Sequence, residues 1–117
     1  MQLVEITYDN AQPIDGYGPG FFRVGGQVIE GAVIVTASAA RGWHGIDDAG
    51  ALTALAGQVD VILFGSGAEM TGAPAALVRA VEAAGIGLEP MASPSACRAY
   101  NVLLAEGRRV ALAALPV

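Results

Sequence analysis

VDVILFGSGAEM, residues 59–70, contains a short apolar run that is followed by two glycines separated by a serine. An apolar run with little polar alternation predicts a strand buried on both faces, as in parallel sheets covered by helices. Pro74, a few residues further on, favours the first turn of a helix. The order of strand, loop and helix predicts a crossover unit, and ligands usually bind at the loop that follows such a strand.

Composition excludes several classes of function. The 117 residues form a chain of one domain's size, so we expect a single domain over residues 1–117. The net charge is -5 and lysine is absent, which argues against nucleic-acid binding and excludes Schiff-base chemistry and a P-loop. One cysteine, Cys97, and one histidine, His44, permit no internal disulfide and no cluster of such metal ligands. We therefore predict no metal and no cofactor.

The sequence predicts a protein without membrane insertion. No apolar run approaches the roughly 18 residues that a membrane span requires. Glu5 and Asp9 lie where a signal peptide would have its basic start and apolar segment. We therefore expect a cytoplasmic protein.

The first third of the chain is rich in strand formers and glycine. It predicts a strand over residues 3–8, a loop over 10–20, and a hairpin whose strands, 21–24 and 27–35, are joined by Gly25 and Gly26. Gly31, inside the second of these strands, indicates a bulge or a close approach of the backbone. Residues 36–46 are predicted to be irregular.

From Asp47 onward, helix and strand signals alternate. Asp47 or Asp48 caps a helix that ends at Gly57, and Ser93 with Pro94 predicts the start of the last helix. The predicted helices are 48–56, 75–84 and 93–106, and the predicted strands are 59–64, 86–91 and 108–115. Crossovers of this size join parallel strands. We predict a layered α/β fold with a central mixed sheet, helices packed on it, and an N-terminal β-hairpin. Strand 59–64 is predicted to be the central strand. Four apolar strand residues are predicted to be buried: Val61, Leu63, Val110 and Leu112.

Gly65, Ser66 and Gly67 are the first candidate site. Backbone N–H groups at the end of a strand could bind an anion. A dinucleotide fingerprint would need a third glycine at position 70, which is Met70, and the chain is short for a dinucleotide fold. The alternative is that these glycines only permit a sharp exit from a buried strand.

The last helix contains a second candidate cluster. Ser93, Arg98 and Asn101 could contribute to binding, because a helix N-terminus favours negative charge. Asn101 lies in an otherwise apolar segment, so it is either a ligand group or a structural amide bonded to a neighbouring backbone. Cys97 lies where a helix start favours the thiolate, but no base pairs with it in the sequence, so we predict no catalytic residues.

Trp43 and His44 form a third candidate, an exposed tip for recognition of a partner. The alternative for Trp43 is a side chain that closes the core beneath a loop.

The run from Ala96 through Tyr100, Asn101 and Leu103 to Glu106-Gly107-Arg108 resembles a small α/β domain family of unknown biochemical function. The family includes the mitochondrial NADH dehydrogenase (complex I) alpha subcomplex assembly factor 3. The resemblance covers nearly the whole chain, including Trp43 and the Gly65–Gly67 loop. It implies a layered α/β fold, and it supplies no established enzyme activity that could be carried over to this chain.

Two classes of function follow. The favoured class is a non-catalytic interaction protein that assists assembly of a respiratory NADH dehydrogenase or a related membrane complex, with subunits of that complex as partners. The alternative is a domain, or an enzyme, that binds a small molecule or anion at the Gly65–Gly67 loop and the helix start near Ser93. In that case the loop and the helix start should lie at one edge of the sheet. The oligomeric state does not follow from the sequence.

Overall fold

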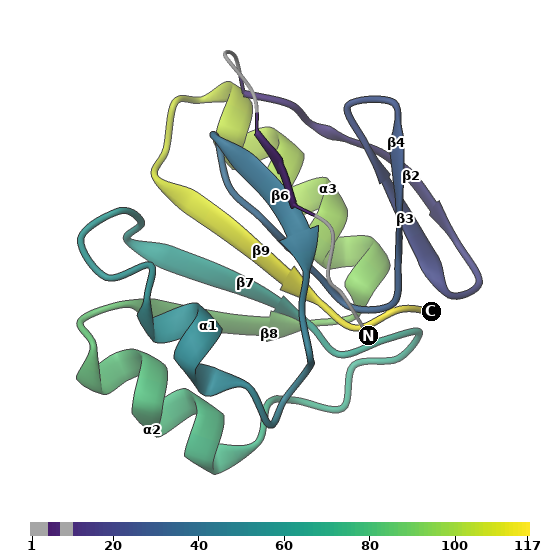
Figure 1. Ribbon diagram of the computed structural model, residues 1–117. Helices are drawn as coiled ribbons and strands as arrows, with labels where there is room; N and C mark the ends of the chain where they lie inside the picture. Colours follow the sequence, from purple (N-terminus) through teal and green to yellow (C-terminus); the bar gives the residue numbers. More distant parts are fainter. Residues whose placement is uncertain (1–4, 8–10) are drawn as a thin grey trace.

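The computed structural model describes residues 5–7 and 11–117 and confirms the layered α/β fold (Figure 1). Six strands form a mixed sheet in the order β1-β6-β5-β9-β7-β8. Its strands are β1 (Glu5–Thr7), β5 (Val33–Val35), β6 (Ala39–Gly42), β7 (Val61–Gly65), β8 (Gly87–Met91) and β9 (Val110–Ala114). Strand β7 pairs in parallel with β8 and β9, and the remaining pairs are antiparallel.

A smaller sheet of three antiparallel strands packs on one side of the large sheet (Figure 1). It consists of β2 (Ile14–Gly18), β3 (Phe21–Val24) and β4 (Gln27–Glu30). The predicted glycine turn joins β3 to β4, with φ of 55° at Gly25 and 80° at Gly26. The Asp15 side chain accepts a hydrogen bond from the Gly26 N–H at 2.8 Å and so ties this turn to β2.

The three predicted helices are present, with two differences at their ends. They are α1 (Ala49–Thr53), α2 (Ala75–Ala83) and α3 (Ser93–Ala105). Asp48 caps α1 as predicted, with its side chain accepting from the Ala51 N–H, but α1 ends three residues early and continues as turns. Ser93 does not cap α3: Ala92 holds that position, and the Ser93 hydroxyl bonds elsewhere. Gly85 and Gly107 follow α2 and α3 with positive φ, as helix-terminating glycines do.

Helices α1 and α2 cover one face of the large sheet, and α3 with the small sheet covers the other (Figure 1). Successive residues of β7 therefore enter different cores. Ile62 and Phe64 pack toward α1 and α2, whereas Leu63 packs toward α3. All five residues of β9 are buried. Burial on both faces explains why the sequence of these strands shows apolar runs and no alternation.

The N-terminal third differs from the prediction. The predicted loop contains β2, and the predicted irregular segment contains β6. The predicted long strand 27–35 is broken at Gly31, where φ is 80° and nothing would touch an added Cβ. Gly31 is thus neither a bulge nor a close approach: it lets the chain leave the small sheet and enter the large one as β5.

Three further expectations need correction or lie partly outside the described residues. The strand predicted to be central, β7, is next to the edge strand β8, because β5, β6 and β1 extend the sheet on the far side of β9. Val61 is half-buried, whereas Leu63, Val110 and Leu112 are buried as expected. The predicted first strand is present at Glu5–Thr7, and its other residues lie outside the described part of the chain.

Candidate functional site

The Gly65–Gly67 loop and the start of α3 lie at the same edge of the large sheet, as the parallel strands predicted. The Ser93 N–H donates to the Gly67 carbonyl oxygen at 2.7 Å. The Gly67 N–H donates to the Ser93 hydroxyl oxygen at 2.9 Å. The two candidate segments are therefore bonded directly to each other.

Ser93 is fully buried and connects three segments. Besides accepting from Gly67, its hydroxyl donates to the Leu115 carbonyl oxygen at 2.6 Å. The hydroxyl thus accepts from the loop after β7 and donates to the chain after β9, and it links these two segments through α3. This position inside the molecule explains why Ser93 does not cap α3.

Gly65 permits the close contact between β7 and α3. A Cβ added at this residue would lie 2.5 Å from the Ser93 hydroxyl oxygen, 2.9 Å from the Ser93 Cα and 3.0 Å from the Ala114 Cβ. The Ser93 Cα belongs to the backbone and the Ala114 Cβ is fixed to it directly, so neither atom can move aside easily. Gly67 has a different requirement, since its φ of 100° favours glycine.

Ser66 also bonds within the protein. Its N–H donates to the Met91 carbonyl oxygen at 2.9 Å, and its hydroxyl donates to the Glu69 carbonyl oxygen at 2.6 Å. The hydroxyl accepts from the Thr71 N–H at 3.2 Å. The N–H groups of Ser66 and Gly67 are therefore directed at protein acceptors, and anion binding here stays a prediction.

Asn101 is bonded to the backbone of Ile14 in β2. The Asn101 Oδ1 accepts from the Ile14 N–H at 2.7 Å, and the Nδ2 donates to the Ile14 carbonyl oxygen at 2.9 Å. These bonds fit the structural alternative for Asn101. Arg98 lies on the exposed side of α3, where its guanidinium donates to the Ser95 hydroxyl at 3.3 Å.

Cys97 is buried against the large sheet. Burial raises the pKa of its thiol from 9.0 to about 11, and the charge of Arg98 opposes this only in part. The expectation that the helix start favours the thiolate is therefore wrong, because loss of solvent raises the pKa of the Cys97 thiol more than the charge of Arg98 lowers it. A protonated, buried thiol is a poor nucleophile.

The structure separates Trp43 from His44. Trp43 is 4% exposed, donates from Nε1 to the Asp48 carbonyl oxygen at 3.0 Å, and makes an edge contact with Phe64. Its position matches the alternative in which it closes the core beneath a loop. His44 is exposed. The apolar side chain that this loop does expose is Ile46, which was not among the predicted site residues.

An apolar cavity of about 300 Å³ opens beside the Gly65–Gly67 loop. Its apolar lining comes from three segments that converge at the carboxyl end of β7. We name it the carboxyl-edge cavity. It is lined by Ile46, Phe64, Ser66, Thr71, Gly72, Ala73, Pro74 and Leu115.

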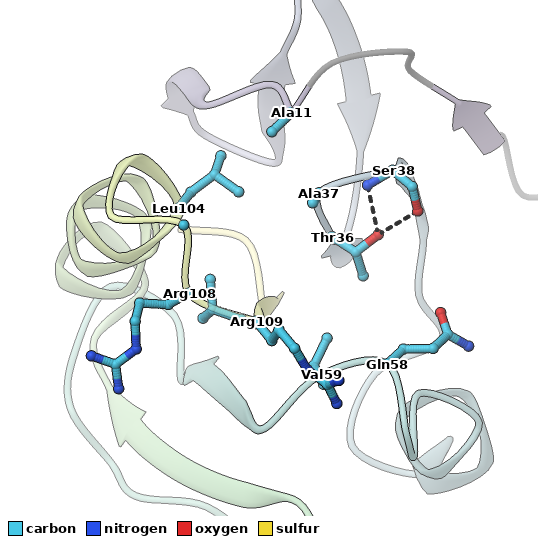
Figure 2. Close-up of a pocket in the computed structure, with 11 residues that line it drawn as sticks. Ala11, Thr36, Ala37, Ser38, Gln58, Val59, Leu104, Arg108 and Arg109 are labelled. Carbon is cyan, nitrogen blue, oxygen red and sulfur yellow. Dashed lines mark hydrogen bonds between the residues drawn. The ribbon is translucent and has the colours of Figure 1, made fainter.

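A second cavity, of about 290 Å³, lies at the opposite edge, where β7 and β9 begin (Figure 2). Arg108 and Arg109 are among its lining residues. Figure 2 shows the Arg108 side chain pointing away from Thr36 and Ser38. Arg109 pairs with Asp60 at 3.3 Å and donates to the Gly57 carbonyl oxygen at 3.0 Å. The Arg109 guanidinium is therefore already paired with a carboxylate and a backbone oxygen.

Comparison with known proteins identifies the family. A family described as "Protein of unknown function (DUF498/DUF598)" matches residues 14–115. This chain belongs to that family. It is 54% identical over 113 residues to an uncharacterized protein of Rhodobacter capsulatus. The aligned region covers 97% of this chain and 91% of the relative.

A more distant relative has a named role. The chain is 26% identical over 110 residues to NADH dehydrogenase (ubiquinone) 1 alpha subcomplex assembly factor 3 of Danio rerio. The similar region covers 88% of this chain and 63% of the assembly factor. The resemblance noted in the sequence is therefore confirmed.

Solved structures of similar proteins share the fold. The crystal structure of an outer membrane protein from Bartonella henselae has a TM-score of 0.82 and 31% identity, covering 92% of this chain and 97% of that one. A Bordetella pertussis protein described as an Mth938-like domain has a TM-score of 0.71 and 26% identity, covering 99% and 92%. Within the described residues of our chain, no helix has the length and apolar character needed to cross a membrane.

Proposed function

We propose that this DUF498/DUF598 protein is a non-catalytic interaction protein that assists the assembly of a respiratory NADH dehydrogenase (complex I) or a related membrane complex. The observation that carries the proposal is the similarity to assembly factor 3, which extends over 88% of this chain. Protein subunits of that complex are the proposed partners, and the cytoplasm is the proposed location.

The arrangement of polar side chains agrees with a role in binding proteins. Ser93 and Asn101, two of the residues considered for ligand binding, direct their hydrogen bonds at backbone groups of other segments. The Cys97 thiol is buried and protonated at neutral pH. Because these polar groups are used inside the fold, we assign partner binding to exposed side chains elsewhere on the surface.

Deletion of the gene in the organism that encodes it tests the proposal. We expect isolated membranes of the deletion strain to lose most of their NADH-driven quinone reduction, and native gels to show partly assembled complex. Expression of the wild-type chain should restore both. Succinate-driven quinone reduction in the same membranes is the control. Full NADH-driven activity and normal assembly in the deletion strain would contradict the proposal.

The small-molecule alternative has one observation in its favour, the carboxyl-edge cavity beside the predicted loop. A ligand that binds the folded state raises its melting temperature by mass action. Thermal unfolding in the presence of a panel of metabolites therefore tests this alternative. A stabilising metabolite whose effect is lost on substitution of a cavity residue would favour it over the assembly role.

A further inference from the structure

We infer that the carboxyl-edge cavity receives an apolar side chain from a basic segment of a protein partner. The inference rests on the proposed function, because it names the surface and the partner chemistry that an interaction protein of this kind would use. It is carried by the lining of the cavity, by the exposed apolar residues beside it, and by the charges next to them.

The lining of the cavity is suited to an apolar group. Ile46, Phe64, Ala73, Pro74 and Leu115 present carbon atoms to it. The hydroxyl of Ser66 already donates to one backbone oxygen and accepts from one backbone N–H. The hydroxyl proton of Ser66 is therefore already used within the protein and is not available to a polar occupant, which would lose water without gaining this donor.

The size of the cavity favours a single side chain. Its volume of about 300 Å³ is at the lower limit of pockets that enclose drug-sized ligands. Protein interfaces commonly use one aromatic or aliphatic side chain in a pocket as an anchor. Leucine, methionine or phenylalanine would fit this description.

Two large apolar side chains are exposed at this cavity or next to it. Ile46, in the lining, is 42% exposed, and Met70, which directly precedes the lining residue Thr71, is 69% exposed. The two belong to different loops, one before α1 and one after β7. Methionine adapts its shape readily to a partner surface. Together they extend the apolar area beyond the cavity itself.

The charged neighbours are acidic. Asp47 follows Ile46, and Glu69 precedes Met70; both are exposed. Among the described residues, the ion pair recorded is Arg109 with Asp60, so neither of these carboxylates is neutralised by an arginine. None of the described residues that line the cavity is an arginine. A partner segment that carries lysine or arginine beside its apolar anchor would match this charge.

Short peptides test the inference directly. The probe is the peptide KKGLGKK, added to the ¹⁵N-labelled full chain and followed by the shifts of backbone amide signals. Two matched peptides change one property each: KKGSGKK removes the apolar anchor, and EEGLGEE reverses the charge. We expect the first to shift amides of residues 44–48, 66–73 and 115, and both others to bind at least roughly tenfold more weakly. Added salt should weaken its binding.

Variants of the protein locate the site. Ile46→Ser should weaken binding of KKGLGKK by roughly tenfold, and Glu69→Lys should weaken it and reduce its salt dependence. Val102→Ser is the matched control, because Val102 is 57% exposed on α3. Glu82→Lys is the charge control, on the exposed side of α2. Both controls should bind as the wild type does.

Several results would overturn the inference. The first is that KKGLGKK at about 1 mM shifts no backbone amide signals. The second is that it shifts amide signals elsewhere on the molecule. The third is that EEGLGEE binds as tightly as KKGLGKK. Sedimentation that shows dimers lost on Ile46→Ser would instead assign the cavity to a second copy of the chain. A metabolite that competes for the cavity in thermal unfolding would assign it to a small molecule.

Complementation separates failure of this inference from failure of the proposed function. One outcome is an assembly defect in the deletion strain that expression of Ile46→Ser and expression of Glu69→Lys each correct fully. In that case the proposed docking surface is wrong and the assembly role stands. If the deletion strain has no defect but KKGLGKK binds as expected, the assembly role is wrong and the surface serves another partner. If the inference is correct, Ile46→Ser restores assembly less well than Val102→Ser.

Discussion

Asn101 and Ile14, 87 positions apart in the chain, exchange two hydrogen bonds. The side-chain amide of Asn101 accepts from the N–H of Ile14 and donates to its carbonyl oxygen. A residue on a neighbouring antiparallel strand would make the same two bonds. The amide thereby fastens β2, at the margin of the small sheet, to α3. A polar residue on this apolar helix thus has a specific structural partner.

Asn101→Ala should lower the free energy of unfolding by about 1–3 kcal/mol, because the N–H and carbonyl of Ile14 lose their partners together. Asn101→Asp should also destabilise, since a carboxylate accepts from the N–H but cannot donate to the carbonyl. Urea unfolding measures both. Val102→Ala, an exposed neighbour on α3, is the control and should stay within about 0.5 kcal/mol of wild type. An unchanged Asn101→Ala would show that these bonds contribute nothing to stability.

Gly65→Ala should destabilise the protein by about 1–3 kcal/mol or more, because the new methyl group would overlap the Ser93 backbone. Gly50→Ala in α1 adds the same group where the nearest atom, Asp48 Oδ1, is 3.9 Å away. There alanine should stabilise the helix by about 0.5–1 kcal/mol. Opposite signs for the two substitutions in chemical unfolding would establish that Gly65 is required for close packing. Equal effects would contradict it.

Leu63→Ala should lower the free energy of unfolding by about 2–5 kcal/mol, because Leu63 is 3% exposed in the core between the sheet and α3. Val61→Ala, two residues earlier on β7, serves for comparison. Val61 is half-buried, so its truncation should be less costly. A loss well under about 1 kcal/mol for Leu63→Ala would mean that the site collapses around the smaller side chain.

The second half of the fold was predictable because its signals are local. Asp48, Gly85 and Gly107 mark helix ends through their own side-chain or backbone chemistry. The N-terminal third was less predictable. Residues 27–35 form one β-like run in the sequence, but Gly31 divides it between two sheets. Which sheet a strand joins depends on partners distant in the chain, such as β9 for β5, and no local pattern contains that information.

The candidate site shows the same division. The parallel arrangement of β7 and β8 correctly placed Gly65–Gly67 beside the start of α3. The inward direction of the Ser93 hydroxyl was not predictable, because its acceptor is the carbonyl of Leu115, beyond the end of β9. Ile46 and Met70 were overlooked for another reason. A single apolar residue in a polar loop is ambiguous until burial is known, although its acidic neighbour is a usable signal.

The pH dependence of stability should reveal the buried thiol of Cys97. Burial raises the pKa of Cys97 from 9.0 to about 11 in the folded protein. Between these values the unfolded chain releases the proton while the folded chain keeps it, so the folded state loses stability as pH rises. The contribution of the protonated thiol to the free energy of unfolding is complete below pH 9 and lost by about pH 11, and it amounts to at most about 3 kcal/mol.

Cys97→Ala lacks this contribution while keeping the tyrosines and arginines. The difference in stability between wild type and Cys97→Ala should therefore shift against the wild type over this interval in urea unfolding. A constant difference from pH 8 to about 11 would mean that the thiol titrates alike in both states.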